Sequence, residues 1–395
     1  MGGKEKIFVL TGATGFLGSH LMAALIARGE RIIVLGRSKE GKAFTDRVAE
    51  LLAWFGLAGS RERIRSVEAD FLKSSLGLTA KEYGALCAAA AGGQIIHCAS
   101  DTRFSEQNRR ESMDTNVHSL IGITGLAKDM DASFFHYIST AYVCSGETPL
   151  CLETPVNTHA FANIYEETKA LAEREVTGIC REHGIPFTIL RPAIVYGDFR
   201  TGRANHFSAL YYHVKSLYYI REIYVNDIER HGGRKSDKWG IYLDGEGTLH
   251  MRLRIFFARH GTVNLIPIDY FVAAAISILE HAEPSVIYHI TSDTPRTTEE
   301  LASYCGRYLK IKGIEPLYRG GPDGSPMNPP EALFNRFIEP YRPYLTDFRT
   351  FDRANTNRVT PGIYPPVLTY EVFERCMDYA VSLNWGNRKW RSGPG

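Results

Sequence analysis

The sequence predicts an α/β protein with a doubly wound parallel sheet and a smaller, mostly helical C-terminal lobe. Ile7–Leu10 is a short apolar run without alternation, which is typical of a strand buried on both faces. A glycine-rich turn, a helical pattern and a second apolar run at Arg31–Leu35 follow, which together make a βαβ unit of about 30 residues. Strand-like and helix-like segments then alternate to about residue 198, as expected of a parallel sheet with crossover helices.

Composition excludes several classes of protein. The chain has 395 residues, of which 44% are hydrophobic and 23% charged, so it has the make-up of a globular protein with a sizeable core. The 46 basic and 44 acidic residues nearly balance, so charge gives no argument for a nucleic-acid partner.

The cysteines and the apolar runs bear on the compartment. Seven cysteines without a C-x-x-C pair favour reduced thiols and no metal site. The N-terminus MGGKEK leads directly into the first strand and leaves no room for a signal peptide, and no apolar run reaches the length of a membrane span. We therefore expect a cytoplasmic protein without a transmembrane segment.

The turn after the first strand predicts a dinucleotide site of the Rossmann type. Its sequence is Thr11-Gly12-Ala13-Thr14-Gly15-Phe16-Leu17-Gly18, between a strand and a helix. Gly12 suits the tight turn, Gly15 lets the backbone approach a pyrophosphate, and Gly18 permits close packing of helix and strand. The free N–H groups of the helix start then face the anion. We expect the cofactor to contact Thr11, Gly12, Thr14, Gly15, Phe16, Leu17 and Gly18.

The end of the second strand favours NADPH over NADH. Proteins that prefer NAD usually have Asp or Glu here to accept the ribose 2′-hydroxyl, whereas this chain has Arg37. A guanidinium suits a 2′-phosphate, and Arg47 in the following helix can reach the same group. A solvated charge at a strand end is the alternative interpretation of Arg37.

A second group of residues has the composition of an acid–base site. Tyr165 and Lys169 are four residues apart and share one face of a predicted helix. A nearby ammonium favours the phenolate and brings a tyrosine pKa of about 10 toward neutrality. Thr140 follows an apolar strand and can donate a hydrogen bond to a substrate oxygen. His97, at another strand end, is more often structural than catalytic at such a position.

TGATGFLG resembles the extended short-chain dehydrogenase/reductase family, which demands a Tyr-x-x-x-Lys pair downstream after a Ser/Thr-rich strand end. Ile138-Ser139-Thr140-Ala141-Tyr142-Val143 and Tyr165–Lys169 meet that demand. The resemblance implies that Thr140, Tyr165 and Lys169 are catalytic and that Lys169 also holds the nicotinamide ribose. It implies further cofactor contacts at Asp70 and Phe71, at Cys98, Ala99 and Ser100, at Ser139, and at Pro192, Ala193, Ile194 and Val195.

Several stretches resemble one branch of that family, the thioester reductases and fatty acyl-CoA reductases. They are Ala69–Leu78 (ADFLKSSLGL), Ile96–Phe104, His136–Val143 (HYISTAYV), Asn264–Tyr270 (NLIPIDY) and Pro343–Thr356. Ser100 departs from the branch, which has Ala there. The resemblance implies an NADPH-dependent reductase that acts on an acyl-CoA or a carrier-protein-bound thioester and releases an aldehyde or alcohol. A ketone or alcohol dehydrogenase, a sugar-nucleotide epimerase or dehydratase, and a non-catalytic cofactor-binding sensor remain alternatives.

The expected domains are an NADP-binding domain at 1–198, to which 262–293 return, and a substrate-binding lobe at 199–261 and 294–395. The lobe mixes aromatic and basic residues, which fits either an apolar pocket with a basic rim or a plain amphipathic insertion. We expect Arg230–Lys238 to be a mobile loop, and 315–330 a Pro/Gly loop that covers the cleft or only connects. The oligomeric state, monomer or homodimer, stays open.

Overall fold

The computed structural model describes residues 6–144, 149–158, 160–318 and 326–386. The chain forms two compact units. Unit 1 comprises Met1–Ala193, Ile268–Thr291 and Phe351–Tyr364. Unit 2 comprises Ile194–Pro267, Ser292–Thr350 and Pro365–Gly395. These boundaries differ from the expected ones mainly at residues 351–364, which cluster with unit 1.

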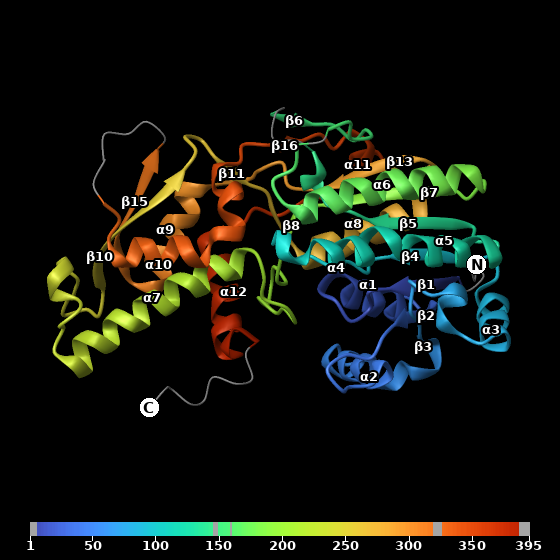
Figure 1. Cartoon of the computed structure of the whole chain (residues 1–395), viewed down its shortest axis with the longest axis horizontal. Helices are drawn as coiled ribbons and strands as arrows, with labels where there is room; N and C mark the ends of the chain where they lie inside the picture. The colour runs from blue at the N-terminus through green and yellow to red at the C-terminus, as the bar shows by residue number, and fades with distance from the viewer. Residues whose placement is uncertain (1–5, 145–148, 159, 319–325, 387–395) are drawn as a thin grey trace. The chain divides into compact units, whose positions relative to one another are not determined.

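Unit 1 is built on a seven-stranded sheet with the order β13-β7-β5-β4-β1-β2-β3, in which every neighbouring pair is parallel (Figure 1). The strands are β1 (Ile7–Thr11), β2 (Arg31–Gly36), β3 (Ile64–Glu68), β4 (Gln94–His97), β5 (Phe134–Ile138), β7 (Phe187–Pro192) and β13 (Val286–Ile290). The predicted fold class is confirmed. Strand order reverses between β1 and β4, and ligands bind outside the carboxyl ends of the strands at such a point.

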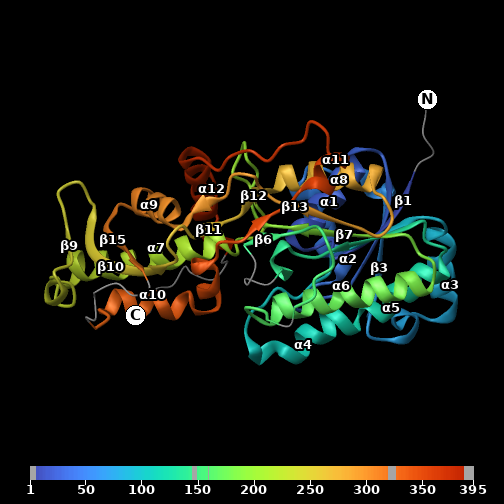
Figure 2. The ribbon, with the colours of Figure 1, turned by 90° about the horizontal axis from the view of Figure 1, so that it is seen from above.

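Helices cover both faces of this sheet. Figure 2 shows α1 and α8 on one face and α4, α5 and α6 on the other. The helices of unit 1 are α1 (Phe16–Ala27), α2 (Phe44–Trp54), α3 (Ala80–Ala90), α4 (Arg109–Met113), α5 (Leu120–Asp129), α6 (Ile164–Glu182), α8 (Ile268–His281) and α11 (Ala354–Val359). Apolar side chains of β1, β4, β5 and β7 pack against α5 and α6 in a core that includes Val9, Ile95, Phe135, Ile189 and Val176. This core fixes the sheet edge at which the candidate site lies.

Unit 2 contains helices around a three-stranded sheet. Its helices are α7 (Leu210–His231), α9 (Thr298–Leu309), α10 (Pro329–Phe337) and α12 (Tyr370–Ser382), and its sheet has the order β15-β10-β9 from β15 (Ile311–Tyr318), β10 (Leu249–Phe257) and β9 (Tyr242–Leu243). Two-stranded pairs join β8 (Ile194–Tyr196) to β12 (Leu265–Pro267) and β11 (Thr262–Val263) to β14 (Arg296–Thr297). α9 begins with a capping box of Thr297 and Glu300.

Two expected loops differ in the structure. In the stretch 230–238, Asp227 Oδ2 accepts hydrogen bonds from Lys235 N, Ser236 N and Ser236 Oγ, at 2.9, 2.9 and 2.8 Å. This closes the chain on the end of α7, so the stretch has a hydrogen-bonded turn in place of the expected open loop, and its mobility stays a prediction. In the 315–330 stretch, Glu315–Tyr318 belong to β15 and α10 begins at Pro329, while 319–325 lie outside the described residues.

Among the described residues, no helix is both long and apolar enough to cross a membrane.

Candidate active site

The glycine loop lies between β1 and α1 and is packed against the end of β4. Gly12 has φ +69°, and a Cβ there would lie 2.6 Å from Ala99 N and from the carbonyl carbon of Cys98. A Cβ at Gly18 would collide with the carbonyl oxygen of Gly12. Gly12 is thus needed for a turn and a close approach, and Gly18 for helix–strand packing, in the roles predicted for them.

The start of α1 is arranged to receive an anion. Gly15 is the N-cap and is exposed, and no side chain caps the helix. The first N–H groups, of Phe16 and Leu17 among others, therefore have no partner within the helix, and the macrodipole adds to their attraction for a phosphate. The loop fits the pyrophosphate of a dinucleotide for these reasons.

Thr11 and His97 join the loop to β4. Thr11 Oγ1 accepts hydrogen bonds from Cys98 N and Ala99 N, each at 3.1 Å, and lies 2.9 Å from His97 Nδ1. His97 is buried, and burial with the nearby Lys169 charge lowers its pKa to about 3. The neutral imidazole thus serves as an acceptor for the Thr11 hydroxyl, which agrees with the structural interpretation of His97.

Arg37 and Arg47 meet where a ribose phosphate is expected. Arg47 donates from Nη2 to Thr14 Oγ1 (2.8 Å) and from Nη1 to the carbonyl oxygen of Arg37 (3.1 Å), so it bridges the glycine loop and the end of β2. The Arg37 side chain is exposed. Gly36 has no room for a side chain, because a Cβ would collide with the ring of Phe44. An acidic side chain at that position is excluded sterically.

Asp70 and Phe71 lie in the turn after β3. The Asp70 carboxylate accepts from Leu72 N at 3.2 Å and pairs with Lys73 Nζ at 3.3 Å, and it remains half-exposed. The Phe71 ring meets His97 edge-on with centroids 6.3 Å apart. Both residues therefore belong to the same edge of the sheet as the glycine loop.

The residues after β4 are held by Asn116. The Asn116 amide accepts from Ser100 Oγ (3.0 Å) and Asp101 N (2.7 Å), and it donates to Asp101 O and to Thr168 Oγ1, each at 2.9 Å. Thr168 lies on α6, next to Lys169. Asn116 thus connects the Cys98–Ser100 turn to the helix that carries the candidate catalytic pair.

Thr140, Tyr165 and Lys169 come together at the carboxyl end of β5. Asn163 caps α6 by accepting from Glu166 N, which starts the helix so that Tyr165 lies in its first turn. The Thr140 side chain lies near enough to the Tyr165 hydroxyl to lower its pKa. Lys169 is 2% exposed, donates from Nζ to Ile138 O at 2.6 Å, and lies 4.3 Å from the centroid of the Tyr137 ring.

The pKa values of Tyr165 and Lys169 differ from the expectation that the ammonium lowers the pKa of the phenol. Burial lowers the pKa of Lys169 to about 8, while charges of Cys98 and Glu173 oppose that shift. Burial raises the pKa of Tyr165, and the Thr140 hydrogen bond acts in the opposite direction. The expected lowering of the Tyr165 pKa by Lys169 is therefore not seen in this structure, because the Lys169 ammonium is directed to the Ile138 carbonyl and desolvation dominates at the phenol.

The remaining predicted residues divide between the two units. Ser139 Oγ is buried without a hydrogen-bond partner among the described residues, at the end of β5. Pro192 and Ala193 belong to unit 1, whereas Ile194 and Val195 form part of β8 in unit 2. Pro192 ends β7, two strands from β4 in the sheet, so it shares the edge at which the glycine loop lies.

Sequence reasoning missed a buried ion pair beside the site. The sequence motifs point to neither Arg191 nor Glu173, although Glu173 lies one helical turn beyond Lys169. Arg191 Nε and Nη2 donate to the two Glu173 oxygens at 2.9 and 2.6 Å. Spacing along α6 was the signal that was available for Glu173.

Phe104, which ends the Ile96–Phe104 stretch that resembles the thioester reductase branch, is another neighbour of Tyr165. Its ring lies 5.8 Å from that of Tyr165, centroid to centroid. It stands beside the phenol.

The cysteines do not form a nucleophile next to Tyr165. Burial raises the pKa of Cys98 to about 11, so its thiol stays protonated. The pKa of Cys144 falls to about 5, first through a hydrogen bond with Cys151 and then through His289 and Arg191, but this sulfur is engaged in the buried Arg191 cluster. All seven cysteines are free thiols, and the described residues contain no group of three or more metal-ligating side chains.

Comparison with known proteins agrees with this geometry. The family described as male sterility protein, an NAD-binding family, matches residues 10–275. Fatty acyl-CoA reductase 1 of Mus musculus is 32% identical over 148 residues, which are 35% of this chain and 28% of that protein. The nonribosomal peptide synthetase asaC of Aspergillus flavus is 25% identical over 214 residues, which are 51% of this chain and 20% of that protein. The chain thus spans well under half the length of these relatives.

Solved structures show the same fold. The terminal R domain from the myxalamid PKS-NRPS biosynthetic pathway has a TM-score of 0.74 and 21% identity, over 98% of this chain and 93% of that one. A thiolation-reductase di-domain from an archaeal non-ribosomal peptide synthetase has a TM-score of 0.66 and 16% identity, over 97% and 92%.

The parallel sheet, the glycine loop and the matching family define an NAD(P)-dependent oxidoreductase of the extended short-chain dehydrogenase/reductase type. Within that class the chain belongs to the male sterility protein family, and the resemblance to the thioester reductase and fatty acyl-CoA reductase branch is confirmed.

Proposed function

We propose that the chain is an NADPH-dependent reductase that reduces the carbonyl of an acyl thioester, carried on coenzyme A or on a carrier protein, and releases an aldehyde or alcohol. The observation that carries the proposal is that Thr140, Tyr165 and Lys169 come together at the carboxyl end of β5, with Lys169 one turn beyond Tyr165 on α6. This group lies on the sheet edge that also holds the glycine loop, where a nicotinamide cofactor binds in such folds.

The choice of NADPH rests on Arg37, Arg47 and Gly36. Arg47 is already held between Thr14 and the backbone of Arg37, so a phosphate there meets a guanidinium at little cost in side-chain entropy. An Asp or Glu at position 36, which would bind the free 2′-hydroxyl of NADH, has no room there, because its Cβ would collide with the Phe44 ring.

Bound NADPH supplies a hydride to the substrate carbon. The hydroxyls of Thr140 and Tyr165 donate hydrogen bonds to the carbonyl oxygen and stabilise the negative charge that develops on it. Tyr165 then gives its proton to that oxygen, and Thr140, which lowers the pKa of Tyr165, stabilises the phenolate that remains, while Lys169 holds the nicotinamide ribose. The resulting hemithioacetal expels the thiol and leaves an aldehyde, so no cysteine acyl-enzyme is needed.

The substrate class follows from the relatives. Fatty acyl-CoA reductases, which are named for the reduction of an acyl-CoA, occur among the matched proteins together with a nonribosomal peptide synthetase. The test is a screen of the full chain with NADPH against acyl-CoAs of several chain lengths, carrier-bound acyl thioesters, ketones and sugar nucleotides. Loss of NADPH fluorescence with formation of an aldehyde or alcohol from a thioester is expected. Turnover of ketones or sugar nucleotides with no thioester reduced contradicts the proposal.

Tyr165→Phe tests the catalytic assignment. Removal of the hydroxyl is expected to lower kcat about 10²- to 10⁴-fold and to leave the Kd for NADPH nearly unchanged, because only proton transfer is lost. Tyr83→Phe on α3 is the matched control, since the Tyr83 hydroxyl donates only to the exposed Asp129. Full turnover by Tyr165→Phe shows the assignment to be wrong.

A further inference from the structure

The Glu173–Arg191 ion pair lies inside unit 1 on the face of α6 that carries the catalytic pair. Tyr165, Lys169 and Glu173 follow one another at intervals of four residues, so they share one helix face on successive turns. Arg191 is 0% exposed and Glu173 is 4% exposed. Both charges are thus out of water, and Glu173 lies one helical turn beyond Lys169.

The strand side of the pair leads to the expected nicotinamide contact. Arg191 is the fifth residue of β7, opposite His289 of β13 in the sheet, and Pro192 and Ala193 follow it. The bidentate contact therefore ties the third turn of α6 to the end of the strand from which the cofactor segment emerges.

The other Arg191 donors are also satisfied. Nη1 donates to His289 Nε2 at 3.3 Å and to Leu152 O at 3.4 Å, and it lies 4.0 Å from Cys144 Sγ. His289 Nδ1 lies 2.8 Å from Asp352 O and donates to it, since Nε2 is the acceptor. Contacts with Glu173, Leu152 and His289 hold the Arg191 guanidinium, so the orientation of its Nε and Nη2 toward Glu173 is fixed.

We propose that Glu173 and Arg191 are positioning residues, which fix the turn of α6 next to Lys169 against the end of β7 and set the charge balance around the Lys169 ammonium. A buried ion pair is weak evidence of stabilisation, because its desolvation offsets its attraction, so its place one helical turn beyond the candidate catalytic lysine calls for another role. The inference rests on the proposed role of Lys169 in holding NADPH.

The pKa values of the groups around Lys169 show which group the Glu173–Arg191 pair can influence near neutral pH. From β5 comes the Tyr137 ring, and from the end of β4 come His97 and Cys98. The pKa of His97 is lowered to about 3 and that of Cys98 raised to about 11, while burial raises the pKa of both Tyr137 and Tyr165. Lys169, with a pKa of about 8, is therefore the group that titrates in the mildly alkaline range.

The charge that each substitution removes determines the direction in which the pKa of Lys169 shifts. Glu173 raises the pKa of Lys169 against the effect of burial. Glu173→Gln leaves Arg191 as an unpaired cation, so Lys169 loses its proton at lower pH. Arg191→Met leaves Glu173 as an unpaired anion, so Lys169 keeps its proton to higher pH. The double variant removes both charges, and the two shifts cancel.

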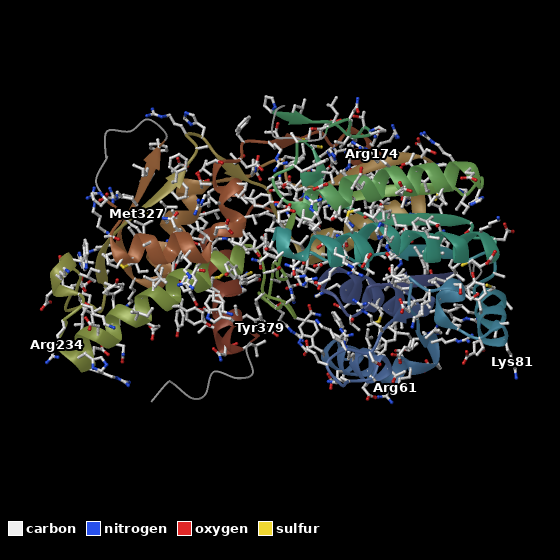
Figure 3. All side chains as sticks on the ribbon, in the orientation of Figure 1. Arg61, Lys81, Arg174, Arg234, Met327 and Tyr379 are labelled. Carbon is white, nitrogen blue, oxygen red and sulfur yellow. The ribbon has the colours of Figure 1, made fainter. Side chains whose placement is uncertain are left out.

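The experiment measures the pH dependence of NADPH affinity, by nucleotide fluorescence, and of kcat/KM in the full chain. We expect the alkaline limb to move down by about one pH unit in Glu173→Gln and up by about half a unit or more in Arg191→Met, and to return to the wild-type position in the double variant. Arg174→Met is the matched control, because Arg174 is next to Glu173 but lies on the exposed side of α6 (Figure 3). It should leave the limb in place.

Thermal unfolding of each variant separates positioning from folding. If Arg191→Met does not fold, Arg191→Lys replaces it, because lysine keeps the positive charge but cannot donate two parallel hydrogen bonds to Glu173. The alkaline limb of the pH profile should then stay in place while kcat falls. Lower thermal stability with no shift of the limb in Glu173→Gln overturns the inference. Because NADPH affinity needs no acyl substrate, shifts in binding without thioester turnover uphold the positioning role while contradicting the proposed reaction.

Discussion

Arg47 joins the two parts of the expected ribose phosphate site through Thr14 and the Arg37 backbone. Arg47→Ala removes the guanidinium and its charge-assisted hydrogen bonds to a 2′-phosphate, a group that NADH lacks. We expect the Kd for NADPH to rise about 10- to 100-fold and that for NADH to rise less than about threefold. Nucleotide fluorescence titration measures both.

Arg61→Ala is the control for this change, because Arg61 is exposed elsewhere on unit 1 (Figure 3). It should leave both Kd values unchanged. Equal weakening of NADPH and NADH in Arg47→Ala means that Arg47 only orders the glycine loop and does not read the phosphate.

Individual residues were predictable where a motif fixes their chemistry. The glycines, Thr140, Tyr165 and Lys169 follow from local spacing, and the structure brings them to one edge of the sheet. Their pKa values were not predictable, since the raised pKa of Tyr165 comes from burial that depends on the whole unit. Arg191 and Glu173 were missed for a related reason: a contact between β7 and α6 has no local sequence signal.

At the scale of elements, adjacent strands β4 and β5 each carry a buried histidine. His136 is 0% exposed, lies 2.8 Å from Thr188 Oγ1 on β7, and stacks on Phe134 with ring centroids 4.6 Å apart. Burial lowers the pKa of His97 and of His136 to about 3 from 6.5. Below pH 6.5 the unfolded chain therefore binds protons that the folded chain does not.

This difference predicts acid destabilisation of the sheet. Since the folded pKa values are depressed, stability is fully present above pH 6.5 and falls as the pH drops toward 3. Between pH 6.5 and 5 each histidine costs about 2 kcal/mol of the free energy of unfolding. Urea unfolding at pH 7 and pH 5 should show that His136→Gln loses about 2 kcal/mol less than the wild type over this range.

His183→Gln, at the exposed end of α6, should lose as much stability as the wild type. An equal loss in His136→Gln and the wild type would mean that other groups govern acid unfolding.

The turn after α7 gives a second prediction for an element. Asp227 binds Lys235 N, Ser236 N and Ser236 Oγ, and Gly232 ends the helix in the left-handed conformation with φ +66°. Asp227→Ala removes the acceptor and leaves these donors unpaired, so residues 232–238 should open. Limited trypsin digestion should then cut after Arg234, Lys235 or Lys238 several times faster than in the wild type.

Glu229→Ala is the control for that change, because Glu229 is exposed on the same helix. Unchanged cleavage in Asp227→Ala would show that the turn is held by its glycines alone. The sequence suggested mobility here because Gly-Gly and the charges of 230–238 are typical of loops, and the carboxylate that orders them lies a helical turn earlier.

Elements with regular patterns were easier to predict than those set by tertiary contacts. The βαβ unit at the start of the chain was predicted because its apolar runs, glycines and helical periodicity are local signals. β10 (Leu249–Phe257) was not assigned as a strand, although it alternates buried and exposed residues over much of its length. Its parallel partner β15 follows about 60 residues later, so no hairpin signal marks the pair.

At the scale of the molecule, unit 1 is assembled from three separate stretches of the chain. The return of residues 351–364 to unit 1 was not predicted, because the segment follows a long run that belongs to unit 2 and its own sequence is short and irregular. Its docking depends on partners about 200 residues earlier. The motif Phe351-Asp352-x-x-Asn355-Thr356 was recognised as a resemblance, but without a structural role.

Glu153 is the residue that joins these stretches. Its carboxylate accepts hydrogen bonds from His289 N on β13 at 2.7 Å, from Thr356 N and Oγ1 at 3.2 and 2.6 Å, and from Asn355 N. The side chain is buried, at 6% exposure. One carboxylate thus holds the chain after β6 (Leu150–Cys151), the strand β13 and the start of α11, and its charge favours the helix N-terminus.

Glu153→Ala should therefore lower the free energy of unfolding of unit 1 by about 3 kcal/mol or more, because four donors lose a shared acceptor in a buried place. Glu175→Ala, exposed on α6, should change it by less than about 0.5 kcal/mol. Hydrogen exchange distinguishes how far the effect reaches. If Glu153 integrates the three stretches, the amides of β13 and of α11 lose protection together in Glu153→Ala. Loss of protection confined to α11 would mean that residues 351–364 dock on a unit that is already complete without them.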